Sequence, residues 1–283
     1  MYLCGFKVVT MIEYNNIRSW VEDLPKKGKI TFSKEEVELQ FPHLTNRNIQ
    51  NTLNRLVIKQ KIQSVWRGFW VVVPVEYGLK GVVDPIEYIA QLMDFLGQKY
   101  YIGLLSAAAI HGASHQQPME LMIVTASNHL RAKIKNDIKI SFVAKREFPL
   151  QYLQQITVRS GYIPVSNPEL TAIDLLLYIK NVGGINRVAT VLSELAEVIN
   201  FERISSDFFL NSNTADIQRL GYLLDTLGFV EIADLLFQKA NEANLRFRKY
   251  PLCIKQQPMD SKKMTVNEKW KIIINEEIDT DEL

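Results

Sequence analysis

The chain has 283 residues, of which 47% are apolar and 23% are charged, as is typical of a soluble globular protein with one to three domains. Its two cysteines, Cys4 and Cys253, are too few for a disulfide framework or a set of zinc ligands. We find no signal-peptide pattern, and no apolar run approaches the roughly 18 residues that span a bilayer. We therefore expect a cytoplasmic protein without membrane segments.

The net charge of +2 conceals an uneven distribution along the chain. Residues 1–80 contain 12 Lys or Arg against 7 Asp or Glu, a net charge of +5. The rest contains 21 basic and 24 acidic residues, a net charge of −3. This split favours a polyanionic partner for the N-terminal part and a different partner for the remainder, with chance scatter as the alternative.

The first elements form a series of short helices and strands. A helix predicted at about residues 11–24 is followed by a Lys-Lys-Gly turn and an extended piece at residues 30–32. Ser33 and Glu36 have the spacing of a capping box, which predicts a short helix there. That helix must end before the Phe41-Pro42 pair, because the residue before proline avoids helical geometry.

A second helix and a hairpin complete the N-terminal module. Thr45 is placed to cap a helix that runs to about Gln60. Two β-rich runs, residues 61–66 and 69–74, then surround Arg67-Gly68. The order helix, strand, helix, helix and hairpin predicts a winged helix-turn-helix domain over residues 1–76.

The helix after Thr45 carries a face suited to reading DNA. If Ile49, Leu53 and Leu56 face inward, the opposite face carries one guanidinium and three amides. Arginine pairs bidentately with guanine, and asparagine or glutamine with adenine, whereas nearby cations meet phosphates. Docking to a protein is the alternative use of such a module. The expected DNA-binding residues are Thr45, Asn46, Arg47, Gln50, Asn51, Asn54, Lys59, Lys61 and Arg67.

A linker at residues 74–81 leads into the second part of the chain. Asp84-Pro85 has the pattern of a helix start. Residues 101–110 are small or apolar all round, which predicts a buried helix that ends near Gly112, with His111 bonded to backbone in its last turn.

Three chemical interpretations of this region are disfavoured, and one of them, a phosphate-binding loop, would need glycines and a lysine directly after a strand. Ser106 and His111 lie five residues apart, which places them on different helix faces, and no strand-turn-helix setting for a nucleophile is expected. His111 and His115 lack a further ligand. Outside this region, the acidic residues Asp279 and Asp281 belong to a polar end of the chain and are expected to be solvated. We therefore predict no catalytic residues, no metal site and no cofactor.

The rest of the sequence predicts an α+β fold. Residues 119–127, 137–144 and 155–166 are strand-like and indicate a small, mostly antiparallel sheet within residues 82–166. Residues 167–283 are predicted to be mainly helical, with a β-like centre in the last block. The helices are expected at residues 169–184, 185–199, 214–228 and 231–245.

Four phrases follow one another in the second part of the chain: "YYIGLLSAAAIHGASHQQP", "NPELTAIDLLLYIKNVGGINRVATVLSELAE", "IQRLGYLLDTLG" and "NEKWKIIINEEI". In this order they resemble the AbiEi-type antitoxins of bacterial type IV toxin–antitoxin systems. The resemblance covers nearly the whole chain, including the N-terminal winged helix, and it implies an AbiEi-like antitoxin domain over residues 82–283.

The resemblance implies a function in abortive infection systems. Such an antitoxin represses its own operon by binding promoter DNA and neutralises a nucleotidyltransferase-type, AbiEii-like toxin, directly or indirectly. The family supplies no catalytic residues. Two alternatives remain open: a winged-helix transcription factor with a ligand-sensing or oligomerising body and no toxin partner, and an enzyme built on Ser106, His111 and Glu120.

Overall fold

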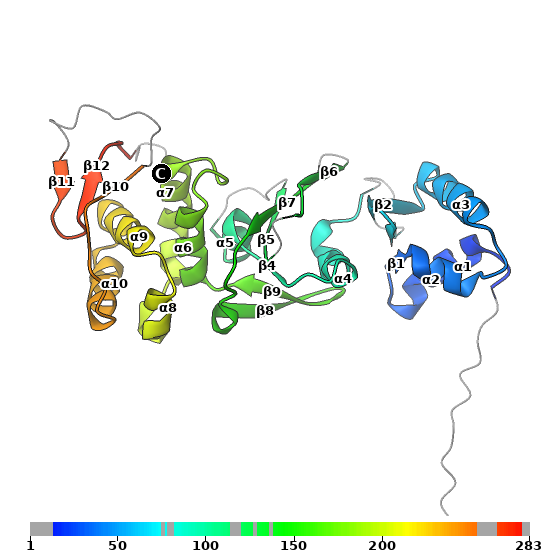
Figure 1. Ribbon diagram of the computed structural model, residues 1–283, viewed down its shortest axis with the longest axis horizontal. Helices are drawn as coiled ribbons and strands as arrows, with labels where there is room; N and C mark the ends of the chain where they lie inside the picture. Colours follow the sequence, from blue (N-terminus) through cyan, green and yellow to red (C-terminus); the bar gives the residue numbers. More distant parts are fainter. Residues whose placement is uncertain are drawn as a thin grey trace, which may run out of the picture. The chain divides into compact units, whose positions relative to one another are not determined.

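The computed structural model describes residues 14–74, 77, 82–113, 120–126, 129–135, 138–253 and 265–278. The chain divides into two compact units, which combine helices and sheets in a mixed α+β fold (Figure 1). The first unit is made of residues 1–97 and 158–161, and the second of residues 98–157 and 162–283.

The division lies after the expected linker at residues 74–81. The segment that follows the linker packs within the first unit, because Gln63 accepts a hydrogen bond from the Val83 backbone N–H (3.1 Å) and the rings of Phe69 and Phe95 lie 5.1 Å apart. The compact unit therefore extends to Gly97, beyond the boundary at residue 76 that the sequence suggested.

The first unit contains the expected order of elements. They are helix α1 (Ile17–Asp23), strand β1 (Thr31–Ser33), helices α2 (Lys34–Gln40) and α3 (Asn46–Ile58), strands β2 (Ile62–Trp66) and β3 (Phe69–Val72), and helix α4 (Ile89–Phe95). Strand β3 lies between β1 and β2 and is antiparallel to both. Two short 3-10 helices, Pro25–Lys27 and Pro85–Glu87, follow α1 and precede α4.

Local signals in the sequence explain where these helices begin. Ser33 accepts a hydrogen bond from the Glu36 N–H while the Glu36 carboxylate accepts one from the Ser33 N–H, which confirms the predicted capping box. Thr45 accepts from the Asn48 N–H (3.3 Å) and caps α3, also as predicted. Asp84 accepts from the Ile86 N–H (3.0 Å) and starts the 3-10 helix before α4.

An aromatic core holds the first unit together. Trp20 of α1 meets Phe32 edge-on with ring centroids 5.3 Å apart, and Phe32 stacks on Trp70 of β3 at 5.7 Å. Ile49 and Leu53 of α3 are buried in the same cluster. Burial of large rings is the main stabilising term in so small a core, and it fixes which face of α3 points inward.

A six-stranded sheet is the centre of the second unit. Its strands lie in the order β6-β7-β5-β4-β9-β8. The strands are β4 (Tyr100–Ile102), β5 (Glu120–Thr125), β6 (Lys133–Lys135), β7 (Ile138–Ala144), β8 (Leu153–Val158) and β9 (Gly161–Ser166). The expectation of a mostly antiparallel sheet holds only in part, because β5 pairs in parallel with β7 and β4 in parallel with β9.

The segment predicted as one helix over residues 101–110 begins as a strand. Tyr101 and Ile102 pair with Val124 and Ile123 in β4, and helix α5 (Leu104–Ile110) starts only after Gly103. Tyr and Ile favour strands once a partner is present. A Cβ at Gly103 would lie 2.8 Å from Val124 Cγ2, so glycine is required where the chain turns from strand to helix.

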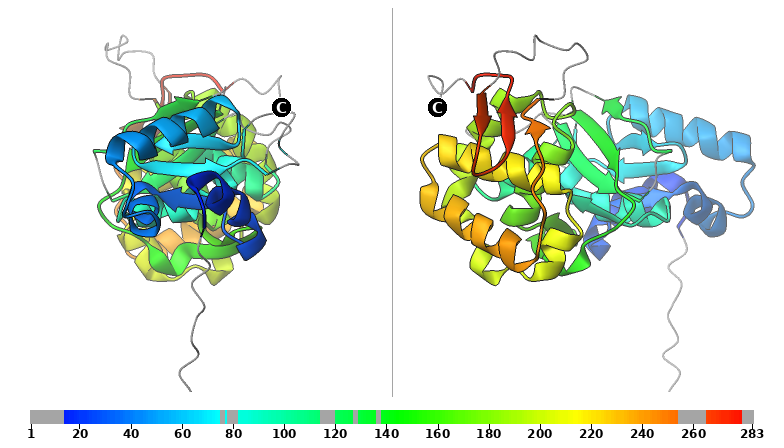
Figure 2. Two further views of the ribbon diagram at one scale, coloured as in Figure 1. Left: turned by 90° about the vertical axis from the view of Figure 1, so that its right-hand side faces the viewer. Right: turned by 60° about the vertical axis from the view of Figure 1, so that its left-hand side comes forward.

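Helices cover the sheet and form the rest of the second unit. They are α6 (Pro168–Leu177), α7 (Ile185–Leu195), α8 (Ser206–Leu210), α9 (Thr214–Thr226) and α10 (Val230–Glu242). Figure 1 and the right view of Figure 2 show α9 and α10 side by side. A second, three-stranded sheet has the order β10-β12-β11, from β10 (Tyr250–Pro251), β11 (Thr265–Asn267) and β12 (Ile272–Ile274).

Helix α6 ends before the position that its glycines suggested. It stops at Leu177 instead of Gly183-Gly184, and a turn follows that is closed by the Asn181 N–H to Tyr178 O bond (2.7 Å) and the Gly184 N–H to Ile179 O bond (2.9 Å). Residues Pro168 to Leu176 are all buried, so α6 is surrounded by protein on every side.

Candidate nucleic-acid interface

Helix α3 presents a polar face to solvent on the surface of the first unit. Ile49, Leu53 and Leu56 are buried, as predicted. The opposite face is exposed, and the left view of Figure 2 shows α3 in full along one side of this unit. The residues exposed there include Arg47, Gln50, Asn51 and Asn54.

Two of these side chains bind each other across one helical turn. Gln50 Nε2 donates a hydrogen bond to Asn54 Oδ1 at 3.0 Å. This contact holds the two amides in place and leaves Gln50 Oε1 and Asn54 Nδ2 available for a ligand. At the start of the helix, Thr45 and Asn46 are exposed, and the Thr45 hydroxyl can donate a hydrogen bond while its oxygen caps the helix.

The segment that contains α3 and the hairpin carries only positive charge. Residues 39–75 contain no Asp or Glu. They contain five exposed cations, which are Arg47, Arg55, Lys59, Lys61 and Arg67. Local positive potential that is not neutralised attracts polyanions.

The cations of α1, of α2 and of the segment between them have acidic partners within the chain. Arg18 pairs with Glu22 at 2.9 Å, Lys34 with Glu38 at 3.0 Å, and Lys29 with Glu36. Within the part of the chain that the structure describes, none of the five cations of residues 39–75 has an ion-pair partner. Among the cations of residues 14–74, those without an ion-pair partner therefore all lie on α3 and the hairpin.

The hairpin between β2 and β3 places Arg67 at its tip. Trp66 pairs with Phe69, so Arg67 and Gly68 form the two-residue connection, and Gly68 has a φ of 80° that glycine adopts without strain. Arg67 is exposed there. At the other end of the hairpin, Lys59 caps the end of α3 and Lys61 precedes β2.

Arg55 belongs to this face although the sequence interpretation left it out. It is exposed in the last turn of α3, four residues after Asn51 and therefore on the same side of the helix. Helical spacing alone would have identified it. At 100° per residue, Arg55 lies closer than Gln50 to the side opposite the buried residues.

The side chains of Ser106 and His111 are used for structure. Ser106 Oγ donates to Glu120 O (3.1 Å) and accepts from the Met122 N–H (2.8 Å), while His111 Nε2 lies 2.6 Å from Ser166 O. The expected backbone bond of His111 is therefore confirmed. A strand-turn-helix setting does exist here, contrary to expectation, but its turn residue with positive φ is Leu104 (55°), which carries no nucleophile.

The described residues contain no group of three or more His, Cys, Asp or Glu side chains placed to hold a metal ion. His115, Asp279 and Asp281 lie outside the described residues. None of the helices that the structure describes is long and apolar enough to cross a membrane.

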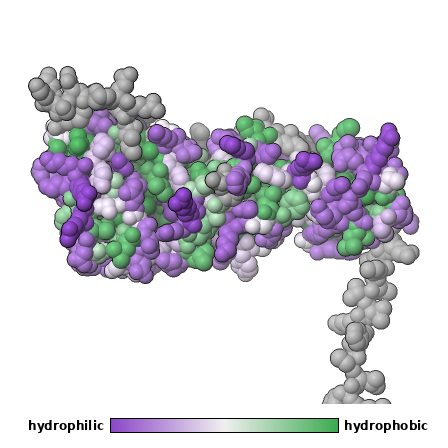
Figure 3. Space-filling model, viewed as in Figure 1, coloured by the Kyte–Doolittle hydropathy of each residue, from purple (hydrophilic) through white to green (hydrophobic). Residues whose placement is uncertain are grey.

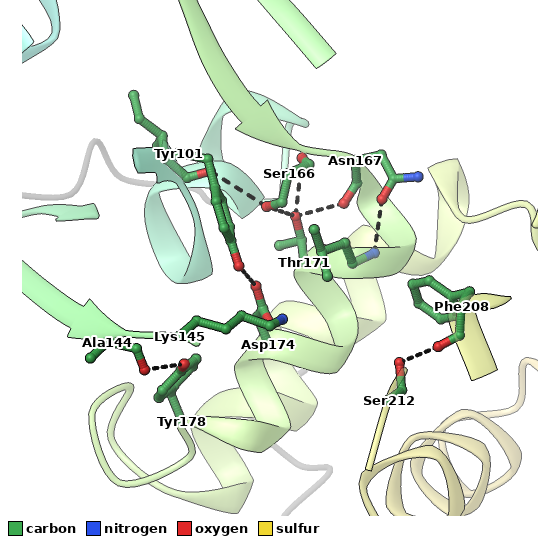
Figure 4. Close-up of polar contacts among 12 residues, drawn as sticks. Tyr101, Ala144, Lys145, Ser166, Asn167, Thr171, Asp174, Tyr178, Phe208 and Ser212 are labelled. Atoms are coloured by element: carbon green, nitrogen blue, oxygen red, sulfur yellow. Dashed lines mark hydrogen bonds and ion pairs between the residues drawn. The ribbon is translucent and has the colours of Figure 1, made fainter. Parts of the chain in front are cut away.

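Residues of the second unit form a buried polar network that the sequence did not reveal (Figure 4). The Asp174 carboxylate is fully buried, and it accepts a hydrogen bond from Tyr101 OH (2.6 Å) and pairs with Lys145 Nζ (2.6 Å). Burial raises the pKa of Asp174, and Lys145 opposes that rise. The network joins β4, the end of β7 and α6 in one fixed arrangement.

A second part of the network lies at the start of α6. The Thr171 hydroxyl donates to Asn167 O (2.8 Å) and lies 2.7 Å from Ser166 Oγ, as Figure 4 shows. Asn167 also caps α6 by accepting from the Leu170 N–H (2.9 Å). The polar residues of this apolar helix therefore have internal partners and do not line an open site.

Part of the second unit is similar to a known family of antitoxin domains. Residues 101–226 match the family model of the AbiEi antitoxin C-terminal domain. The resemblance expected from the sequence phrases is therefore confirmed for this segment.

One solved structure shares the fold over most of its length. The crystal structure of the RV2827C protein from Mycobacterium tuberculosis covers 92% of this chain and 93% of that chain, with a TM-score of 0.64 and 14% sequence identity. At this identity the likeness concerns the fold alone. No curated protein matches the sequence.

Proposed function

We propose that this protein is an antitoxin that also represses its own operon. In this proposal residues 1–76 form a winged helix-turn-helix domain that binds promoter DNA. Residues 82–283 neutralise a co-expressed nucleotidyltransferase-type, AbiEii-like toxin without catalysing a reaction. The antitoxin role rests on the match of residues 101–226 to the AbiEi antitoxin C-terminal domain.

The DNA-binding role rests on one observation: an exposed amide face and five cations that have no ion-pair partner among the described residues lie together on α3 and the hairpin. Figure 3 shows that the visible surface of the first unit is mainly hydrophilic, which suits a phosphate backbone better than an apolar partner. A helix between a short strand and a two-stranded wing is the arrangement in which a recognition helix enters the major groove.

The side chains divide by position into two proposed roles. Arg47, Gln50, Asn51 and Asn54 lie on the exposed face of the first half of α3 and its centre, where they would meet base edges. Thr45 and Asn46 at the helix start, Lys59 and Lys61 after the helix, and Arg67 at the hairpin tip would contact phosphates or the adjacent minor groove.

Co-expression tests the antitoxin half. The product of the neighbouring gene is expressed alone and together with this protein, and growth is followed. The proposal predicts that the neighbouring product alone stops growth and that this protein restores it. A harmless neighbour, or a toxic one that this protein does not counteract, contradicts the antitoxin role.

A paired variant separates the two halves. Arg47→Ala combined with Asn51→Ala is expected to abolish repression of a reporter placed behind the native upstream region, while rescue from the toxin persists. Arg18→Ala is the matched control, because Arg18 is an exposed arginine of the same unit that already pairs with Glu22. Repression that survives the paired variant contradicts the role of α3.

A further inference from the structure

Gln50 and Asn54 form a hydrogen-bonded pair on the exposed face of α3. They lie four residues apart, so their side chains are neighbours across one helical turn. Gln50 Nε2 donates to Asn54 Oδ1 at 3.0 Å, and both residues are exposed. The bond therefore adds little to the core, but it sets the direction in which the Gln50 amide presents its remaining donor and acceptor.

The pair leaves the Gln50 amide with one donor beside one acceptor. Nε2 carries two hydrogens, of which Asn54 takes one, while the other hydrogen and Oε1 stay available. In the major groove adenine presents a donor at N6 beside an acceptor at N7, which matches this amide. Guanine presents two acceptors, N7 and O6, and binding both would need the hydrogen that Asn54 already holds. The hydrogen bond within the pair therefore favours adenine over guanine.

The setting of the pair supports a role in reading a base. Residues 39–75 contain no Asp or Glu, the side chains that accept from cytosine N4. Glutamine is a long side chain that loses rotational freedom when it binds, and an amide that is already held loses less of it. Asn54 thus prepares Gln50 for a contact that Gln50 alone would make less favourably.

We propose that Gln50 reads the adenine of an A·T pair in the major groove and that Asn54 is the positioning residue that orients it. Gln50 Oε1 would accept from adenine N6–H, and the free Nε2 hydrogen would be donated to adenine N7. Asn54 acts through Oδ1, which leaves its Nδ2 for a neighbouring base. This inference rests on the proposed binding of promoter DNA through α3, and it adds which base is read and by which side chain.

Base analogues in the DNA upstream of the protein's own gene test this assignment. The affinity of the full chain is measured with each adenine replaced in turn by 7-deazaadenine, which lacks the N7 acceptor and still pairs with thymine. The parent is expected to lose about fivefold in affinity at one or more adenines, the usual value of one hydrogen bond. The same replacement at guanines should cause no loss that depends on Gln50.

A variant of Gln50 identifies the side chain that reads this adenine. Gln50→Leu removes both atoms that would meet the base, at similar size and with favourable helix propensity. It should bind the unmodified DNA about tenfold more weakly and no longer distinguish 7-deazaadenine from adenine at that position. Gln40→Leu is the matched control, because Gln40 is an exposed glutamine of α2, and it should retain the fivefold loss.

Two variants of Asn54 test the positioning role. Asn54→Asp keeps an oxygen that accepts from Gln50 Nε2, so it should retain the loss at 7-deazaadenine although its charge weakens binding to all DNA. Asn54→Leu removes that oxygen and should lose most of this sensitivity, together with the preference for adenine over guanine at that position.

The outcomes separate this inference from the proposed function. Upstream DNA that is bound no more tightly than random DNA contradicts both. Specific binding in which no adenine N7 matters, or in which the sensitivity persists in Gln50→Leu or moves to a guanine, contradicts this inference alone. Equal sensitivity of the two Asn54 variants contradicts the positioning role.

Discussion

Replacing Gly221 with alanine is expected to destabilise the second unit, although alanine normally favours a helix. Gly221 lies inside α9, and a Cβ at this position would lie 2.1 Å from Trp270 Cη2 and 2.2 Å from Trp270 Cζ2. The Trp270 ring is fully buried, its Nε1 donates to Asp225 Oδ2 at 2.6 Å, and Phe237 packs edge-on at 5.3 Å. The indole therefore cannot move aside without losing these contacts.

The magnitude follows from two opposing terms. In an open helix, glycine to alanine stabilises by about 1 kcal/mol. Loss of a buried tryptophan's packing costs about 3–5 kcal/mol. The net expectation for Gly221→Ala is a loss of about 2–4 kcal/mol in the free energy of unfolding, measured by denaturant titration with far-UV circular dichroism.

A second background identifies the cause. With Trp270→Leu the space beside Gly221 is empty, so Gly221→Ala is expected to stabilise by about 1 kcal/mol there. Gly228→Ala is the control. The φ of 88° at Gly228 makes alanine unfavourable there, but apart from its chain neighbours no atom lies within 4 Å of the added Cβ. The loss of stability caused by this substitution should therefore be the same in both backgrounds. The steric argument would be refuted if Gly221→Ala left the free energy of unfolding unchanged, or if it lowered that free energy equally in both backgrounds.

Three further substitutions test the buried polar groups. Lys145→Met should cost about 3–5 kcal/mol at neutral pH, because it leaves the Asp174 carboxylate buried without its cation. Burial already raises the pKa of Asp174 from its ordinary 3.8, and loss of the cation raises it further. The variant is therefore expected to lose stability relative to the parent as pH increases from about 4 to 7. Urea unfolding of both proteins across this range measures the difference in stability, and a difference that does not change with pH contradicts the prediction. Tyr101→Phe, which removes a hydrogen bond to the same carboxylate, should cost about 1.5–3 kcal/mol in the same assay, and an unchanged stability would show that the contact is unimportant. Ser106→Ala leaves the buried Met122 N–H unpaired and should lower stability by about 1–3 kcal/mol without affecting rescue from the toxin at permissive temperature. Loss of rescue at an unchanged melting temperature would instead favour a catalytic role of Ser106.

Features set by neighbouring residues were predicted correctly. The capping box of Ser33 and Glu36, the Thr45 cap and the buried face of α3 depend on spacings of three or four residues, which the sequence displays directly. The exposure of Arg47 and Asn51 follows from the same periodicity. The role of Arg47 and Asn51 in binding DNA depends on contacts with a partner molecule and stays a prediction.

Features set by distant partners were missed. Tyr101 and Ile102 were assigned to a helix because the run is apolar on every side, and only their pairing with Val124 and Ile123 makes them a strand. The parallel pairing of β5 with β7 likewise has no local signal. Asp174 lies within an apolar helix pattern, and nothing near it in sequence indicates that Lys145 and Tyr101 compensate its burial.

The affinity of the full chain for its own upstream DNA, compared with random DNA, tests the central claim most directly. Arg47→Ala and Asn51→Ala are each expected to weaken binding to the upstream sequence by about 1–3 kcal/mol and to leave binding to random DNA nearly unchanged. Arg67→Ala should weaken binding to both DNAs and reduce the dependence of affinity on salt. Equal losses on both DNAs for all three variants, or affinity that none of them changes, would contradict recognition of DNA through α3.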